Sequence, residues 1–310
     1  MSAIARHKAW LRPVGLALGS LLTLAAIGVA LWHVDFSAIA RAQSWHWVVM
    51  ILAVTGNLAL GGVTFWIVTL SFDAKPPVSL ARTTTLVAGT ALANYLPLRP
   101  GIAGRAAYLK LRHGLPLRQS LIILLIVTIL GTALVLVAAL SALLLSSHGP
   151  AAIVIASLAF VLLLMVITGP IAQRVIRRPL VAAWSWPLLR ALDLALASLR
   201  LWVAFEILGH PVPLSVALLT GSGGVLVSLV GLTPNGLGME EWTIAALTAA
   251  TADLPDAAAL GLAAALVDRA FEAIVVVPAG VIALRWLARE AREVPASETH
   301  DVASSGTPER

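Results

Sequence analysis

The chain has 310 residues, of which 59% are hydrophobic and 12% are charged, and its mean hydropathy is +0.94. Soluble domains carry about 25% charged residues, so this composition excludes an ordinary soluble enzyme and predicts a polytopic membrane protein. The absence of cysteine excludes disulfides and thiolate chemistry, and the basic residues behind the net charge of +6 form no aromatic-interleaved surface that would bind nucleic acid.

Several apolar runs are long enough to cross a bilayer, which takes about 20 residues of helix. They lie at residues 14–32, 47–70, 119–146, 150–169, 188–208 and 258–284. The first run follows Arg6, Lys8 and Arg12, as the apolar core of a secretory signal would. It is longer than such a core and further runs follow it, so we interpret it as an uncleaved first helix.

Two further segments, at residues 78–96 and 213–232, are more polar and share one pattern of Pro, Ser and Gly. Each begins at a Pro-x-Ser sequence and is rich in Thr, Ser and Gly. Each is followed by a Pro/Gly break and then by a Leu-Pro sequence. The matching positions are Pro77 with Pro213, Ser79 with Ser215, Pro97 with Pro234, Gly101 with Gly238, and Leu115 and Pro116 with Leu254 and Pro255. Broken backbone at membrane depth is stable only where protein or a water-filled cavity satisfies it. We therefore predict that each segment forms a re-entrant helical hairpin, which returns to the side that it entered from.

The predicted fold is an all-α polytopic membrane protein with about seven full spans and two re-entrant broken-helix hairpins in inverted repeats. We expect a single transmembrane domain over residues 1–289, with repeat one near 47–146 and repeat two near 188–288, and a disordered cytoplasmic tail at 290–310. With both termini cytoplasmic, the first hairpin opens to the cytoplasm and the second to the outside. Lys and Arg then fall on cytoplasmic segments, with Arg41 as the exception. This pattern predicts a multi-pass protein of the inner membrane of a prokaryote.

Ionisable residues at membrane depth are costly and mark functional sites by default. Arg99 and Arg105 lie around the break in "NYLPLRPGIAGR", close to Asn94 and Tyr95. Because guanidinium groups grip phosphate or carboxylate in a fork, we expect these four side chains to bind a lipid headgroup. The alternatives are that the arginines lie at the cytoplasmic interface and follow the positive-inside rule, and that the polar pair hydrogen-bonds neighbouring helices.

The second segment ends in "GLTPNGLGMEEW", where Glu240 and Glu241 begin the next helix. We expect Glu241 to contact the substrate and Glu240 to belong to a gate. The alternative is that the acids cap the helix, because negative charge suits the N-terminal end of the helix dipole.

The last span, "LAAALVDRAFEAIVVVPAG", carries Asp268, Arg269 and Glu272. Helical spacing places Asp268 and Glu272 on one face, with Arg269 within reach of Glu272 at i,i+3. We expect Arg269 to contact the substrate and the two acids to form a gate or an ion pair, the alternative being a structural salt bridge. Asp193 and Arg200 share a face of the preceding span, and Asp193 is expected near the interface.

At these positions the sequence resembles the lysylphosphatidylglycerol synthase transmembrane family, also called flippase-like membrane proteins. Members share an N-x-x-P-x-R-x-G-E-x-x-R stretch, a later P-G-G-L-G-x-x-E stretch and a final span with an arginine. The matching residues are Asn94, Pro97, Arg99, Gly101 and Arg105 in the first, Pro234, Gly236, Leu237, Gly238 and Glu241 in the second, and Arg269, Pro278 and Gly280 in the third. Ile102 stands where the family often has Glu, and Asn235 replaces a glycine. The resemblance covers nearly the whole chain and implies movement of lipids between leaflets. Some members carry an aminoacyl transferase domain after this region, so lysyl transfer by this chain is not expected.

Together these features predict a lipid translocase that moves a phospholipid or a polyprenyl-type lipid. The expected partners are membrane lipids, a separate lipid-modifying enzyme, and a second copy of the chain through Gly15 and Gly19, whose spacing is typical of helix dimers. No cofactor, metal or nucleic acid is expected, because the histidines show no ligand spacing and no nucleotide-binding or hydrolase motif occurs. Two alternatives stay open. One is a membrane-embedded enzyme that acts on lipid-linked substrates through Glu240, Glu241 and Asp268, and the other is a non-catalytic partner in an envelope pathway.

Overall fold

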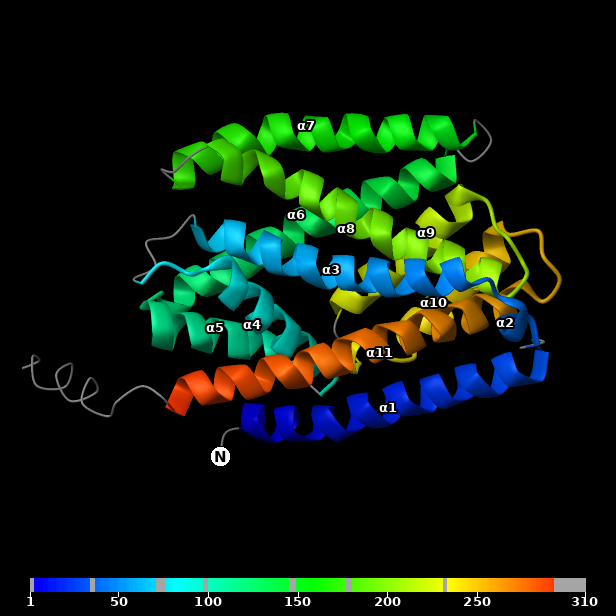
Figure 1. Ribbon diagram of the computed structural model, residues 1–310, viewed down its shortest axis with the longest axis horizontal. Helices are drawn as coiled ribbons and strands as arrows, with labels where there is room; N and C mark the ends of the chain where they lie inside the picture. Colours follow the sequence, from blue (N-terminus) through cyan, green and yellow to red (C-terminus); the bar gives the residue numbers. More distant parts are fainter. Residues whose placement is uncertain are drawn as a thin grey trace, which may run out of the picture.

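The computed structural model describes residues 3–33, 37–70, 76–96, 100–144, 149–176, 180–230 and 233–292. Every element in these ranges is helical, which confirms the all-α prediction (Figure 1). The long helices are α1 (Ala3–His33), α3 (Ser44–Leu70), α6 (Leu117–Leu144), α7 (Pro150–Ile176), α8 (Leu180–Ile207) and α11 (Ala257–Arg292). The shorter elements are α2 (Ser37–Arg41), α4 (Leu80–Ala93), α5 (Pro100–His113), α9 (Leu214–Val230), the 3-10 turn η2 (Pro234–Gly236) and α10 (Met239–Thr251).

Two sets of four helices repeat the same order of lengths, long, short, short, long. Helices α3, α4, α5 and α6 have 27, 14, 14 and 28 residues, and α8, α9, α10 and α11 have 28, 17, 13 and 36. At 1.5 Å per residue a 14-residue helix spans about 21 Å, which is less than the roughly 30 Å of a hydrocarbon core. The short pairs occupy the two segments that the sequence marks as hairpins, and their re-entry into a membrane stays a prediction.

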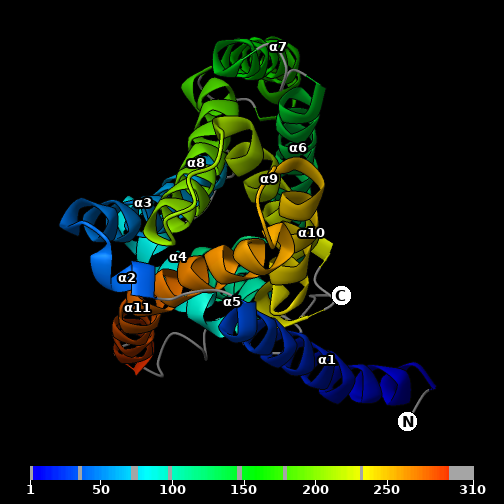
Figure 2. The ribbon, with the colours of Figure 1, turned by 90° about the vertical axis from the view of Figure 1, so that its right-hand side faces the viewer.

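The two short pairs lie toward opposite ends of the molecule. In Figure 1, α1 begins and α11 ends at the same end, and the α4–α5 pair lies nearer to it. The α9–α10 pair lies nearer to the other end. The view along the long axis in Figure 2 places α7 at the periphery, beside α6 and α8. Helix α11 runs past both pairs and packs against α4 and α10.

Close helix contacts depend on glycine where α11 crosses α4. A Cβ atom added to Gly280 would lie 2.4 Å from Leu92 Cβ and 3.1 Å from the carbonyl oxygen of Ala88. The two helices can pack this closely only because residue 280 has no side chain, and a larger residue would force them apart. The contact fixes the first short pair against α11.

The predicted dimer contact in α1 has a different environment at Gly19. This glycine is buried, and an added Cβ would lie 3.3 Å from both Thr233 Cβ and the Leu237 carbonyl oxygen of the same chain. Trp242 Nε1 also donates a hydrogen bond of 3.1 Å to the Leu22 carbonyl oxygen. Gly19 therefore serves to pack α1 against the second short pair, and dimerisation stays a prediction.

The predicted start of the C-terminal tail differs from the structure by a few residues. Helix α11 continues to Arg292, and residues 293–310 lie outside the described residues. Glu290 forms an ion pair of 2.8 Å with Arg82, and its carbonyl oxygen accepts a hydrogen bond of 2.5 Å from Arg112 Nη2. The last turn of α11 is thus tied to α4 and α5.

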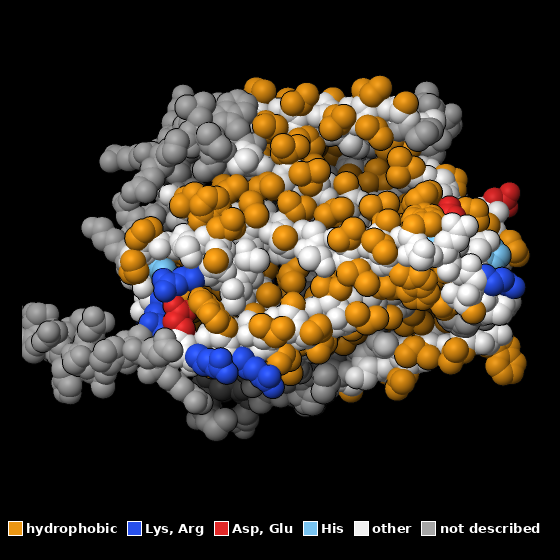
Figure 3. Space-filling model, viewed as in Figure 1, with side chains coloured by type: hydrophobic (Ala, Val, Ile, Leu, Met, Phe, Trp, Pro, Cys, Tyr) orange, Lys and Arg blue, Asp and Glu red, His pale blue; other side chains and the backbone are white. Residues whose placement is uncertain are grey.

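Apolar side chains cover much of the surface. Large exposed hydrophobic residues occur on α1, α3, α6, α7 and α11, among them Leu24, Leu52, Leu140, Leu162 and Ile282. Figure 3 shows hydrophobic side chains across the middle of one face, with Lys and Arg gathered toward the end where α11 finishes. Within the described residues, one helical stretch, Ser44–Ile67, is apolar and long enough to cross a membrane. The prediction of about seven spans is therefore not confirmed.

The α4–α11 crossing predicts opposite effects for the same substitution at two glycines. Gly280→Ala should destabilise the protein by about 1–3 kcal/mol, because the new methyl group overlaps Leu92. Gly28→Ala, in α1, has nothing within 4 Å of the new Cβ and should stabilise the protein by about 0.5–1 kcal/mol through helix propensity. Thermal unfolding in mild detergent measures both. Equal shifts of the same sign would contradict the close crossing.

Candidate functional site

The break in the second short pair is a sharp turn built from left-handed backbone. Asn235, Gly236 and Gly238 have φ values of 47°, 74° and 79°. Asparagine tolerates this region better than other side chains, and Gly238 also lacks room for a Cβ, which would lie 2.3 Å from Leu22 Cβ. The turn directs the Asn235 carbonyl oxygen toward α11 and begins α10, so that two acids lie in the first turn of that helix.

Arg269 of α11 is the centre of the site. Its Nη2 donates a hydrogen bond of 2.9 Å to the Asn235 carbonyl oxygen, and its Nε lies 3.2 Å from Glu241 Oε1. Its Nη1 lies 3.0 Å from Glu272 Oε2, which confirms the expected i,i+3 ion pair, and a further ion pair joins it to Glu240. The guanidinium has five N–H donors in one plane, and it contacts four groups on three elements, η2, α10 and α11. Arg269 therefore ties the second short pair to α11.

Arg200 of α8 forms a second ion pair, with Asp268, which directly precedes Arg269 in α11. Its Nε and Nη2 donate to the two carboxylate oxygens of Asp268 at 2.7 and 2.6 Å, in the fork geometry that makes arginine–carboxylate pairs strong. Its Nη2 also lies 3.8 Å from Glu272, and its Nη1 donates to Asn57 Oδ1 at 3.3 Å. Asn57 in turn donates to Asp193 Oδ1 at 2.8 Å. These contacts link α3, α8 and α11 in one polar network.

The side chains of the charged cluster are largely shielded from solvent. The exposed fractions are 11% for Arg200, 12% for Arg269 and 1% for Glu241. The cluster holds two guanidinium groups and the four carboxylates of Glu240, Glu241, Asp268 and Glu272, so its formal charge with every group ionised is 2 − 4 = −2. Glu241 Oε2 is buried and has no hydrogen-bond partner among the described residues. The carboxylates outnumber the guanidinium groups, so the positive charge of each arginine limits how well the cluster is neutralised.

The first short pair presents an arginine in the opposite situation. Arg105 Nε donates to Thr90 Oγ1 at 2.7 Å, and its guanidinium carbon lies 5.5 Å from the centre of the Phe65 ring. Within the part of the chain that the structure describes, no carboxylate lies within ion-pair distance of Arg105. Close by, Asn94 Oδ1 is buried and has no hydrogen-bond partner among the residues that the structure describes, and a Cβ added to Gly101 would lie 2.4 Å from it.

Tyr95, which follows α4 at the first break, lies near the charged cluster. Glu272 and Arg269 are near enough to act electrostatically on its hydroxyl group, which is buried and has no hydrogen-bond partner among the described residues. Asn235 lies in the second break, and its Nδ2 donates to Glu272 Oε1 at 3.4 Å. Glu272 therefore accepts a hydrogen bond from the second break and lies near Tyr95 of the first.

The structure brings together most of the residues that the sequence predicts. Tyr95, Glu240, Glu241, Asp268, Arg269 and Glu272 form one cluster, and Asn94 and Arg105 lie at the first break. Arg99 lies outside the described residues. Sequence reasoning missed the partnership of Arg200 with Asp268 and the role of Asn57, whose only signal is an amide in an otherwise apolar run.

No protein-family model, curated protein or solved structure matches this chain. Among the described residues, no group of three or more His, Asp or Glu side chains is arranged to hold a metal ion. Function is therefore inferred from the geometry of the charged cluster and of the Arg105 environment.

The excess of acids predicts that Arg269 and Glu240 differ sharply in their contribution to stability. Arg269→Gln leaves buried carboxylates without a counter-charge and should lower the free energy of unfolding by about 3–5 kcal/mol. Glu240→Gln removes a surplus negative charge and should change it by about 1 kcal/mol or less.

Denaturant or thermal unfolding of both purified variants measures the difference. If Glu240→Gln is as destabilising as Arg269→Gln, positive charge does not limit the neutralisation of the cluster and the interpretation is wrong.

Proposed function

We propose that the chain is a lipid translocase of the membrane, in which the first short pair binds the anionic headgroup of a phospholipid or polyprenyl-type lipid. The observation that carries this proposal is the environment of Arg105. Its only described polar partner is the Thr90 hydroxyl, whereas Arg200 and Arg269 are both held by carboxylates. A cation in a low-dielectric site requires an opposite charge, and a phosphate group supplies one in the geometry that guanidinium prefers.

The start of α5 adds to this environment. The first N–H groups of a helix lack partners within the helix and carry partial positive charge, which favours an anion. Helix α5 begins at Pro100, directly after the break, and Arg105 follows within its second turn. Asn94, whose side-chain oxygen has no hydrogen-bond partner in the described part of the chain, lies against Gly101 in the same region. An anionic headgroup at this point would contact both the helix start and the guanidinium.

The surface and the two short pairs support the proposed membrane placement. Large apolar side chains are exposed on α1, α3, α6, α7 and α11, and contiguous apolar surface marks a site that contacts protein or membrane. We place α4–α5 and α9–α10 as re-entrant pairs entering from opposite sides, with about seven full spans around them and both termini in the cytoplasm. Paired broken helices that meet near the middle of a bilayer are the architecture of alternating-access transporters.

The charged cluster on α11 would then act as the second gate. Arg269 holds the second break through Asn235, Glu240 and Glu241, and Glu272 accepts a hydrogen bond from Asn235 of the same break. If the second pair moved, Arg269 would exchange one partner for another and would not be left with an unpaired charge. The alternative of a membrane-embedded enzyme has less support, because its candidate acids face Arg269 and Arg200.

Lipid movement in reconstituted vesicles tests the role of Arg105. The probe is fluorescent phosphatidylglycerol, whose arrival in the outer leaflet is measured by bleaching with dithionite. Arg105→Gln should slow its transfer by about 10- to 100-fold, because the variant loses a charged hydrogen bond to the headgroup.

Arg82→Gln is the matched control, since Arg82 is 40% exposed and pairs with Glu290 at the end of the molecule. It should transfer lipid at the wild-type rate. Equal transfer by wild type and Arg105→Gln, at equal reconstitution, would overturn the proposed headgroup site.

A further inference from the structure

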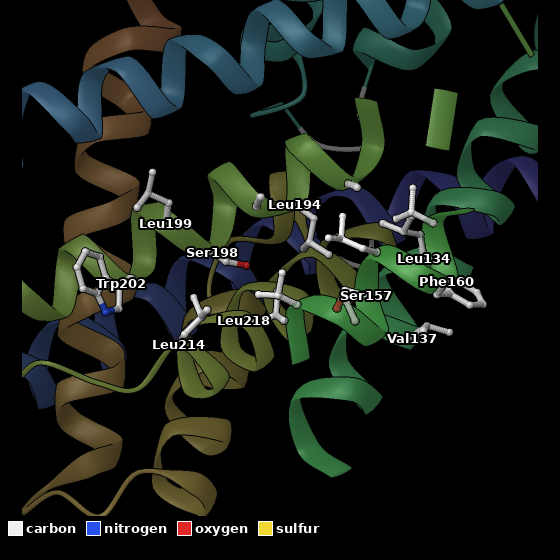
Figure 4. Close-up of a pocket in the computed structure, with 16 residues that line it drawn as sticks. Leu134, Val137, Ser157, Phe160, Leu194, Ser198, Leu199, Trp202, Leu214 and Leu218 are labelled. Carbon is white, nitrogen blue, oxygen red and sulfur yellow. The ribbon is translucent and has the colours of Figure 1, made fainter. Parts of the chain in front are cut away.

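A cavity of about 710 Å³ lies between α6, α7, α8 and α9, beside the part of α8 that carries Arg200. Its wall is almost wholly apolar, and among the described residues that line it only Ser157 and Ser198 carry hydroxyl groups. Figure 4 shows the labelled side chains spread from Trp202 at one end to Phe160 at the other, so the space is elongated. The indole N–H of Trp202 donates a hydrogen bond of 3.1 Å to the Val212 carbonyl oxygen. Because this polar group is satisfied there, the ring forms an apolar end of the cavity wall.

Water is a poor occupant of this cavity. A buried water molecule needs two to four polar partners, and apolar cavities stay dry. The hydroxyl oxygens of Ser157 and Ser198 are buried and have no hydrogen-bond partner among the described residues. These two hydroxyl groups offer too few partners to hydrate a space of this volume. An apolar occupant therefore fits the cavity better than water does.

The entrance to the cavity shows where that occupant comes from. Leu134, Leu194 and Ser198 in the wall are buried, whereas Val154, Leu158 and Leu214 are exposed. Around the exposed wall residues, the outer faces of α6 and α7 carry further exposed apolar side chains, such as Leu140, Ile155 and Leu162. An opening in such a surface admits hydrocarbon more readily than a polar solute.

We infer that this cavity binds one hydrocarbon chain of a membrane lipid, which lies along the groove from Trp202 to Phe160. The volume falls within the range of roughly 300–1,000 Å³ that is usual for small-molecule sites. The inference depends on the membrane placement in the proposed function, but it does not depend on lipid transport or on Arg105. Ser198 lies two residues before Arg200 on α8, so a bound chain would lie next to the polar network.

Photo-crosslinking in vesicles tests this inference. The probe is phosphatidylglycerol with a diazirine near the end of one acyl chain, diluted into phosphatidylcholine, and adducts are located by mass spectrometry. Adducts are expected on buried wall residues such as Leu134 and Leu194. Adducts confined to outward-facing residues of α6 and α7 would overturn the inference, and this map requires only the wild-type protein.

A variant that fills the cavity provides the second measurement. Ala195 lines the cavity on α8, and Ala195→Phe should reduce adducts on the wall about tenfold, since the ring displaces roughly two methylene groups of the lipid. Leu192→Phe, on the exposed side of the same helix, should leave them unchanged. Unchanged adducts in Ala195→Phe would contradict chain binding. Arg105→Gln should keep the adducts while losing transfer, so the two proposals can fail separately.

Discussion

The arrangement of the helices depends on the need to neutralise two guanidinium groups in the interior. Arg200 and Arg269 are about nine-tenths buried, and an unpaired charge in such a place costs several kcal/mol. Arg269 draws the turn at Asn235 and the first turn of α10 onto α11, and Arg200 joins α8 to Asp268 and α3 to both through Asn57. The left-handed turn is stable because the carbonyl oxygen that it exposes is used by Arg269.

The two short pairs differ in how their charges are satisfied, and this difference suggests how they divide the work. The second pair is held by several ion pairs, so its position is coupled to the charged cluster of α11. The first pair is held by packing at Gly280 and by the contacts of Arg82 and Arg112 with Glu290, and its Arg105 has a hydroxyl and an aromatic ring as partners among the described residues. In the proposed function the first pair therefore binds the ligand, and the second pair acts as the gate.

Much of the fold was predictable, because the lengths of the apolar runs and the positions of the Pro/Gly breaks determine where the helices begin and end. The apolar runs fall on the long helices, and the Pro/Gly breaks fall between the short ones. The i,i+3 pair of Arg269 and Glu272 was predictable, since it depends on helical spacing alone. The pairing of Arg200 with Asp268 was not, because it joins residues far apart in the chain, and Gly19 packs within the chain although its spacing suggests a dimer. Asn235 supplies two contacts to the cluster that its sequence position does not indicate.

The central claim is that the two short pairs enter the membrane from opposite sides. The chain has no cysteine, so single cysteines can be placed without a background. Lys110→Cys, at the exposed end of α5, and Asp253→Cys, in the exposed loop after α10, are labelled with a membrane-impermeant maleimide in intact cells and in inverted vesicles. The account predicts that Asp253→Cys reacts only in intact cells and Lys110→Cys only in inverted vesicles. Labelling of both positions from the same side would contradict it.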